Sequence, residues 1–328
     1  MAKVSIIGGA GFVGTYLCKQ LIAKGWDFEI IDIKASNSFP ERTKIGDIRN
    51  LQSLREKISG DFVVNLAAIH RDDVQDLSQY HETNVLGSRN ITKVCTEKGI
   101  KNILFTSSVA VYGYADPDTD EEGKIEPFNE YGRTKFEAEE VFRKWQKEGD
   151  YSLTIVRPTV IFGEGNRGNV FNLFNQIESG KFFMIGSGEN KKSMAYVQNV
   201  AAFLETCLGS KKKYLLSNYV DAPDLTMNEL VSLVRFKLKG KYNVGLRIPY
   251  MLGLFIGYAC DTCSKILNVQ LSISALRIKK FTSSTQFKSA QCDLEGFAPP
   301  FSLVDAIEQT LHSEFVVKNP NKEIFYTE

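Results

Sequence analysis

Residues 4–14 read VSIIGGAGFVG, and this stretch decides the fold. The apolar run VSII predicts a buried strand, and Gly8, Gly11 and Gly14 follow it at the spacing GxxGxxG. The first glycine permits the tight turn that leaves the strand. The second lets a pyrophosphate approach the backbone at a helix N-terminus, and the third lets the helix pack closely on the strand. The stretch therefore predicts the strand, turn and helix of a dinucleotide-binding site.

A second apolar run ends in an acidic residue about twenty positions after the glycines, the spacing expected of this fingerprint. Residues 28–32 read FEIID, which places Asp32 where the ribose hydroxyls of an adenosine bind. The carboxylate would accept hydrogen bonds from those hydroxyls and repel a 2′-phosphate, so the sequence favours NAD over NADP. Lys34 leaves NADP open as an alternative, because a cation at that position could still hold the phosphate.

The first 160 residues alternate short β-branched runs with longer amphipathic stretches, which is the pattern of βαβ units. We expect strands at residues 3–7, 28–32, 44–46, 62–66, 102–106 and 152–156, and helices at residues 12–24, 51–58, 78–98 and 131–147. Most of these strands are continuous apolar runs, as is typical of strands covered on both faces. The pattern predicts an α/β fold with a Rossmann-type, doubly wound parallel sheet.

The regular alternation loosens after residue 160, where glycines separate mixed helices and short strands. We expect an NAD-binding Rossmann domain over residues 1–160 and a smaller C-terminal α+β substrate-binding lobe over residues 161–328. No flexible linker marks the border, so the two parts should be interleaved. Residues 195–220 are expected to return to the first.

The bulk composition is that of a globular protein with a small-molecule partner. The 328 residues are 43% hydrophobic, and 40 basic against 39 acidic residues give a net charge of +1, which argues against a nucleic-acid partner. The start of the chain runs directly into a strand without a secretory signal, so we expect a cytoplasmic protein. Cys260 and Cys263 form a single CxxC without a second pair, so no metal site is expected.

The longest nearly apolar stretch, residues 248–260, reads IPYMLGLFIGYAC. It is too short to cross a bilayer, which takes about 20 residues, so no integral membrane segment is expected. We interpret it as a buried helix. A surface that rests on a membrane or forms an oligomer contact is the alternative, because periodicity does not separate these cases.

Tyr131 and Lys135 form a YxxxK pair on an expected helix, where residues four apart share one face. A free phenol has a pKa of about 10, and a neighbouring ammonium together with a nicotinamide cation would favour its phenolate. Tyr131 is therefore the candidate general acid/base. Ser108 follows the expected strand 102–106 at its carboxyl end, where open α/β sheets bind ligands. Its hydroxyl can hydrogen-bond the substrate oxygen whose proton the tyrosine takes.

Further motifs follow in a fixed order. They are GDI at 46–48, NLAA at 65–68, TNVLG at 83–87, SSVAVYG at 107–113, YGRTK at 131–135, RPTVIFG at 157–163 and MAYV at 194–197. Together with the glycine turn and Asp32, these motifs resemble the extended short-chain dehydrogenase/reductase superfamily, particularly its nucleotide-sugar epimerase and dehydratase branch. The resemblance runs through most of the chain.

The resemblance implies a role for each matching residue. The cofactor would contact Gly8, Gly11, Phe12, Val13, Asp32, Asp47, Ile48, Leu66, Ala67, Ala68, Tyr131 and Lys135. Within this set, Asp47 and Ile48 would embrace the adenine, and Lys135 would bind the ribose and lower the tyrosine pKa. The catalytic residues would be Ser108, Tyr131 and Lys135, and the substrate-binding residues Ser108, Asn169 and Lys192. Asn84 would support the architecture of the site.

Two departures from the family pattern narrow the activity. Dehydratases of this branch usually carry Thr-Asp-Glu where this chain has Ser107-Ser108-Val109, so a 4,6-dehydratase is disfavoured. The family often places an arginine before the YV block to clamp the diphosphate, whereas this chain has Lys191-Lys192, which keeps the charge but not the bidentate fork. His70 to Asp73 are interpreted as a solvated loop, with a polar wall for sugar hydroxyls as the alternative.

The leading hypothesis is an NAD-dependent epimerase that inverts C4 of a nucleotide-activated sugar through a transient keto-sugar. The resemblance also suggests a homodimer packed through residues 78–98 and 131–147. The alternatives are an NAD(P)-dependent ketoreductase of a nucleotide-sugar and a hydroxysteroid-dehydrogenase-like enzyme, whose apolar C-terminal lobe resembles residues 248–260. A dinucleotide sensor without catalysis is disfavoured, because it would not need Ser108, Tyr131 and Lys135.

Overall fold

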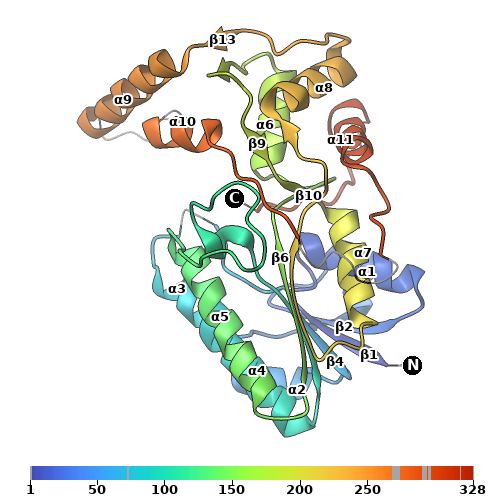
Figure 1. Ribbon diagram of the computed structural model, residues 1–328. Coiled ribbons are helices and arrows are strands. Elements are labelled where there is room, and N and C mark those ends of the chain that lie inside the picture. Colours follow the sequence, from blue (N-terminus) through green and yellow to red (C-terminus); the bar gives the residue numbers. More distant parts are fainter. Residues whose placement is uncertain are drawn as a thin grey trace.

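The apolar runs of the sequence form one parallel sheet in the computed structural model, which describes residues 2–71, 74–267, 274–289, 294, 297–317 and 319–327 (Figure 1). The sheet has seven strands in the order β11-β6-β5-β4-β1-β2-β3. They are β1 (Lys3–Ile7), β2 (Asp27–Asp32), β3 (Thr43–Ile45), β4 (Phe62–Asn65), β5 (Asn102–Thr106), β6 (Ser152–Pro158) and β11 (Tyr214–Tyr219). The strand order reverses between β1 and β4, and such a switch point is where open α/β sheets bind ligands.

Helices cover both faces of this sheet. Helices α1 (Phe12–Ala23) and α7 (Val197–Leu208) share a core with one face, and α2 (Leu51–Lys57), α4 (Gly87–Lys98) and α5 (Glu130–Lys147) share a core with the other. This architecture confirms the predicted Rossmann-type, doubly wound fold. The six expected strands agree with the observed ones to within two residues at each end, and β11 is a seventh strand that the sequence analysis did not identify.

The expected helix over residues 78–98 is present but not uniform. It begins as a single turn, α3 (Ser78–Tyr80), continues as a π-helical segment, η2 (His81–Leu86), and ends as α4. A π-helical turn inside an α-helix often marks a functional site. In this chain the segment contains Asn84, whose side chain is buried beside the predicted catalytic helix.

The chain beyond β6 builds a second layer of helices with short strand pairs. Its strands are β7 (Val160–Phe162), β8 (Met184–Ile185), β9 (Lys191–Lys192), β10 (Met194–Tyr196), β12 (Leu225–Thr226) and β13 (Arg247–Ile248), which pair as β7 with β10, β9 with β12 and β8 with β13. Helices α6 (Asn169–Glu178), α8 (Met227–Lys239) and α11 (Leu303–Leu311) pack around Phe174, Leu230 and Ile307. Phe12 of α1 belongs to the same core, so this layer interlocks with the sheet.

Residues near the C-terminus return to the glycine turn. The ring of Phe325 lies 5.6 Å from that of Phe12, and Phe325 forms an isolated parallel bridge with Asn166. The hydroxyl of Ser38, in the loop after β2, donates to Glu323 at 2.5 Å. Figure 1 shows the C-terminal end of the chain above the sheet, between it and the second layer.

Helix α9 (Tyr250–Leu267) contains most of the apolar stretch 248–260, and the prediction that this helix is buried is wrong for one of its faces. Met251 and Phe255 are 74% and 72% exposed, whereas Gly253 and Gly257 are buried. The glycine side packs on Ile185 and on α10 (Ala275–Thr282), and the opposite side projects from the edge of the molecule (Figure 1). Among the described residues, no helix is long and apolar enough to cross a membrane.

Candidate functional site

The glycine turn after β1 leaves no room for side chains. Gly8 has a φ of +80°, and a Cβ there would lie 2.6 Å from the backbone nitrogen of Ala67; a Cβ at Gly14 would lie 2.5 Å from the Cα of Gly9. Helix α1 begins after Gly11 without a side-chain cap and without an acidic residue in its first turn. The free N–H groups and the positive end of the helix dipole therefore suit a pyrophosphate, which is what NAD presents there. Phe12 and Val13 form this first turn.

Asp32 lies half-buried at the carboxyl end of β2. One carboxylate oxygen accepts a hydrogen bond from the Ala10 backbone N–H at 3.0 Å, and the other accepts one from the Lys34 backbone N–H at 3.3 Å. These bonds hold the carboxylate beside the glycine turn. Lys34 contributes its backbone N–H to this arrangement, and its ammonium forms no ion pair with Asp32.

The predicted adenine contacts come from the loop after β3. The Arg49 guanidinium binds the carboxylate of Asp47 at 2.7 Å and holds the pKa of that carboxyl below its usual range. Ile48 is 5% exposed, and its carbonyl accepts a hydrogen bond from Asn90 at 3.0 Å. Both residues are therefore fixed in position, with the carboxylate of Asp47 held by an arginine that the sequence analysis did not consider.

Leu66, Ala67 and Ala68 follow β4, the neighbour of β1. The backbone N–H of Leu66 donates to the carbonyl of Ile7 at 2.9 Å, and that of Ala67 donates to the side chain of Asn65 at 3.2 Å. The predicted cofactor residues on β1, β2 and β4 thus gather at one edge of the sheet, at its switch point. A dinucleotide laid across the strand ends of such a sheet would bind at this edge.

Ser108 lies near Tyr131, and its side chain acts through a hydrogen bond to lower the pKa of the tyrosine. Ser108 follows β5 and caps the short helix η3 (Val109–Tyr112), accepting a hydrogen bond from the Ala110 N–H at 3.1 Å. Asn129 caps α5 by accepting from the Gly132 N–H at 2.9 Å, which places Tyr131 in the first turn of that helix. Two caps therefore fix the two hydroxyls relative to each other.

Burial is the main influence on the pKa values of both Tyr131 and Lys135. Burial raises the pKa of Tyr131 above its ordinary value, and the Ser108 hydrogen bond opposes this rise. Lys135 donates to the carbonyl of Thr106 at 2.6 Å and lies 4.2 Å from the centre of the Phe105 ring, while burial lowers its own pKa to about 7. The ammonium of Lys135 is thus directed at a strand carbonyl, and burial has the largest effect on the pKa of Tyr131.

Asn84 binds two parts of the site together, as the sequence resemblance implied for its role. Its side-chain oxygen accepts from the Ile69 N–H at 2.9 Å, and its amide donates to the Ile69 carbonyl and the Thr134 hydroxyl, each at 3.0 Å. The loop after β4 is thereby tied to α5, between Tyr131 and Lys135.

A buried ion pair supports the same helix, and sequence reasoning missed it. Glu139, one turn beyond Lys135, accepts two bonds from Arg157 of β6 at 2.8 and 2.6 Å. Arg157 also donates to the hydroxyl of Tyr112 at 2.7 Å, which donates in turn to Asn218 of β11 at 2.8 Å. This network connects α5, η3 and two strands. In the sequence, only the arginine of the RPTVIFG motif pointed to this network.

The remaining predicted residues lie around this centre or outside the described chain. Lys192 donates to the carbonyl of Lys280 at 2.8 Å, and burial lowers its pKa to about 8. Asn169 begins α6 and is exposed. Asp72 and Asp73 lie outside the described residues. His70, which was predicted only as part of their loop, lies with its ring 6.4 Å from that of Tyr131 in an edge-on arrangement.

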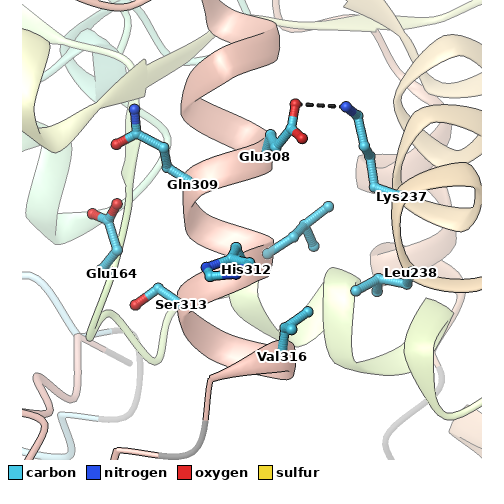
Figure 2. Close-up of a pocket in the computed structure, with 9 residues that line it drawn as sticks. Glu164, Lys237, Leu238, Glu308, Gln309, His312, Ser313 and Val316 are labelled. Atoms are coloured by element: carbon cyan, nitrogen blue, oxygen red, sulfur yellow. Dashed lines mark hydrogen bonds and ion pairs between the residues drawn. The ribbon is translucent and has the colours of Figure 1, made fainter.

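A separate hollow of about 430 Å³ lies beside α11 and α8 (Figure 2). It is lined by Glu164, Lys237, Leu238, Glu308, Gln309, Leu311, His312, Ser313 and Val316. The ion pair between Lys237 and Glu308 at 2.5 Å spans its upper part in Figure 2. None of these lining residues belongs to the predicted site, so the hollow is not the place where the strand ends would bind a dinucleotide.

A Rossmann sheet whose strand ends carry a glycine turn, an acidic residue and a serine–tyrosine pair with a lysine one turn away defines a short-chain dehydrogenase/reductase of the extended type. The sequence comparison gives the family within that class. The chain belongs to the NAD dependent epimerase/dehydratase family, whose model matches residues 4–215. NAD is therefore its cofactor, as Asp32 predicted.

Among curated proteins, the chain is 46% identical over 332 residues to N-acetyl-alpha-D-glucosaminyl-diphospho-ditrans,octacis-undecaprenol 4-epimerase of Escherichia coli O157:H7, a match that covers 99% of each chain. It is 27% identical to UDP-glucose 4-epimerase of Vibrio cholerae, covering 97% of each. A decarboxylating sterol-4-alpha-carboxylate 3-dehydrogenase of Mus musculus is 24% identical, covering 95% of this chain and 90% of that one.

Solved structures show the same fold. UDP-N-acetylglucosamine 4-epimerase from Bacillus cereus aligns with a TM-score of 0.75 at 18% identity, covering 97% of this chain and 98% of that one. The enzyme WbmG of Bordetella bronchiseptica, solved in complex with NAD, aligns with a TM-score of 0.75 at 17% identity, covering 100% of this chain and 97% of that one. At these sequence identities, the structural similarity shows that the fold is shared and nothing more.

Proposed function

We propose that this chain is an NAD-dependent 4-epimerase that acts on an N-acetylhexosamine carried by a polyprenyl diphosphate. The placement of Ser108 after β5 and of Tyr131 in the first turn of α5 supports the reaction type, because their hydroxyls could be presented together to one sugar oxygen. The substrate class is supported by the Escherichia coli relative, which matches this chain over almost its whole length.

The proposal changes the carrier expected from the sequence, from a nucleoside to a polyprenol. Both carriers join the sugar through a diphosphate, so the sugar and phosphate contacts need not differ between them. Two observations favour the polyprenol: the relative at 46% identity is named for such a substrate, and α9 presents an apolar face to the outside. A nucleotide-sugar epimerase is the second candidate, supported by the Vibrio cholerae relative.

Tyr131 and Ser108 would perform the proton transfer. In the oxidising step the tyrosine Oη takes the proton of the sugar C4 hydroxyl, Ser108 holds the same oxygen, and C4 loses its hydrogen as hydride to become a ketone. Bound NAD⁺ supplies the hydride acceptor and later the hydride donor. After the keto-sugar turns over in the site, Tyr131 returns its proton to the C4 oxygen as hydride adds to the other face, so no net oxidation occurs.

Lys135 would position the ribose of the cofactor and stabilise the phenolate form of Tyr131. Both roles need a cation, and burial lowers the pKa of Lys135 to about 7. A negative phenolate one turn away would favour its protonated form. The absence of an Asp-Glu pair after Ser107 in the sequence leaves no acidic pair to remove water, which favours epimerisation over 4,6-dehydration.

The test distinguishes a polyprenyl from a nucleoside carrier, and epimerisation from net oxidation. One sample of the purified protein is denatured to release its nucleotide for mass spectrometry. Separate native samples are incubated in parallel with N-acetylglucosaminyl diphosphoundecaprenol in detergent and with UDP-N-acetylglucosamine. The released sugars are separated by chromatography, and absorbance is followed at 340 nm, where NADH absorbs. We expect bound NAD, formation of the C4 epimer from the lipid-linked sugar and no net absorbance change. Turnover of the UDP-sugar alone would assign the second candidate, and steady NADH formation would contradict both.

We also propose a homodimer that packs through the segment from α3 to α4 and through α5, and that works in the cytoplasm. Helices α4 and α5 lie side by side on one face of the sheet, so two copies could align them as a four-helix contact. Light scattering coupled to size-exclusion chromatography measures the assembly. An Arg133→Glu change on the exposed side of α5 should weaken a dimer of this kind, because it places like charges beside Glu130 and Glu137.

A further inference from the structure

Helix α9 carries an apolar surface that is largely exposed, with Lys279 of α10 contacting only Tyr258 at one end of it. Its outer side consists of Met251, Leu252, Phe255, Ile256 and Tyr258, whose exposed fractions run from 37% to 74%. Single exposed apolar side chains are common on proteins, but a contiguous patch marks an interaction surface. We call these five residues the α9 face.

The sequence of the helix forces this side outward. Gly253 and Gly257 lie four residues apart on the opposite side, where a Cβ would come within 2.7 Å of the Ile185 side chain and 2.8 Å of the Ala275 backbone. The helix can therefore approach Ile185 and α10 only through its glycines. Asp261, on the inner side, accepts a hydrogen bond from the Ala275 N–H at 3.1 Å, which fixes α10 against α9.

The part of the sequence that contains α9 and α10 is strongly basic. Residues 241–289 contain seven lysines and arginines and one acidic residue, whereas the rest of the chain has 33 basic and 38 acidic residues. The acidic residue is Asp261, which is turned toward α10. Lys279 and Lys280 of α10 are exposed, and the Lys279 ammonium donates to the Tyr258 hydroxyl of the α9 face at 3.0 Å. Apolar residues on one side and basic residues next to them are the combination that binds an anionic lipid surface.

We propose that the α9 face docks on the surface of an anionic lipid bilayer, with α9 lying in the interfacial plane and the lysines of α10 at the level of the phosphates. A second copy of this chain is a poorer occupant, because it would bring the same basic residues and no acidic partners for them. The inference rests on the proposed function in one respect: a polyprenyl-linked sugar resides in a bilayer.

The contacts of α10 connect this surface with the predicted active site. The ammonium of Lys280 lies 5.0 Å from the centre of the Phe128 ring, and the next residue, Asn129, caps the helix that carries Tyr131. The carbonyl of Lys280 accepts the hydrogen bond from Lys192, the predicted diphosphate contact. A sugar diphosphate held at the bilayer surface would therefore approach the catalytic hydroxyls from the side of α10.

The experiment is flotation of the full-length protein with vesicles of phosphatidylcholine alone or mixed with phosphatidylglycerol. We expect the wild type to float with the anionic vesicles and to dissociate in high salt. Met251→Ser/Phe255→Ser should lower the vesicle affinity at least about tenfold, because both side chains would lose their insertion. The control is Ile22→Ser/Val317→Ser, which changes two exposed apolar side chains, at 50% and 47% exposure, outside the α9 face and should float like the wild type.

The proposal would be overturned by a wild type that stays at the bottom of the gradient with anionic vesicles, or by an α9-face variant that floats like the wild type. A dimer that only this variant splits, without vesicle binding, would also overturn it and assign the α9 face to a second copy. Activity on a short-chain polyprenyl diphosphate sugar in detergent tests the proposed function separately. We expect the variant to keep this activity, and a wild type without it would contradict the proposed function while leaving the flotation result intact.

Discussion

Replacing Glu139 by glutamine tests whether the buried ion pair behind the catalytic helix holds the site together. The carboxylate has a side-chain exposure of 0% and Arg157 of 2%, and two bonds at 2.8 and 2.6 Å join them. Arg143 is a second partner of this carboxylate at 2.7 Å, and it keeps Glu140 as a partner when Glu139 is replaced. Removing one charge of such a pair leaves the other buried and uncompensated, which typically costs about 3–5 kcal/mol. Glutamine keeps one acceptor, so we expect a loss of about 3 kcal/mol in the free energy of unfolding.

Urea unfolding followed by tryptophan fluorescence measures this loss, because Trp145 lies on the same helix as Glu139. The matched control is Glu139→Leu/Arg157→Met, which removes both charges together. Apolar replacement of a whole buried pair is often neutral or stabilising, so the double variant should be clearly more stable than Glu139→Gln. A Glu139→Gln protein within about 0.5 kcal/mol of the wild type, the usual range for surface changes, would refute this account of the pair.

Three further predictions concern the site and the sheet. Tyr131→Phe should lower kcat about 10²- to 10⁴-fold in the epimerase assay while leaving bound NAD unchanged, since it removes the acid/base and not the pyrophosphate contacts; wild-type turnover would exclude the assignment. Gly14→Ala should give protein without bound NAD on mass spectrometry, because its Cβ would lie 2.5 Å from Gly9 Cα. Burial alone would raise the pKa of Glu29, but bonds from Lys3, Lys44 and two serines lower it to about 2. Its contribution to stability should therefore be complete above about pH 4.5 and be lost as the pH falls toward 2, a dependence that urea titrations should find weakened in Glu29→Gln.

The sequence alone could predict the parts of the fold that local patterns determine. Strands that are buried on both faces consist of continuous apolar residues, and the turn after β1 needs glycine for steric reasons. The strands and the turn can therefore be recognised without a structure. The same holds for Asp32, Ser108, Tyr131 and Lys135, because strand ends and helix spacing place them at one edge of the sheet. The family comparison then confirmed the class and the cofactor that these residues indicated.

The parts that sequence reasoning missed depend on contacts between distant residues. Glu139 and Arg157 are ordinary charged residues in their local patterns, and only the packing of α5 on β6 shows that they are buried together. The direction of Lys135 toward the Thr106 carbonyl is likewise set by tertiary packing. For α9, the hydrophobic period predicted the helix correctly but could not show which side would find a neighbour, because the partner surface is formed by Ile185 and α10.

The return of the C-terminal segment to Phe12 has a consequence for biosynthesis. A ribosome produces the glycine turn and Phe12 about 300 residues before Phe325, and the two rings meet 5.6 Å apart in the finished fold. Folding of a chain begins at its N-terminal part during translation. The sheet can therefore form before Phe325 is available to pack against Phe12.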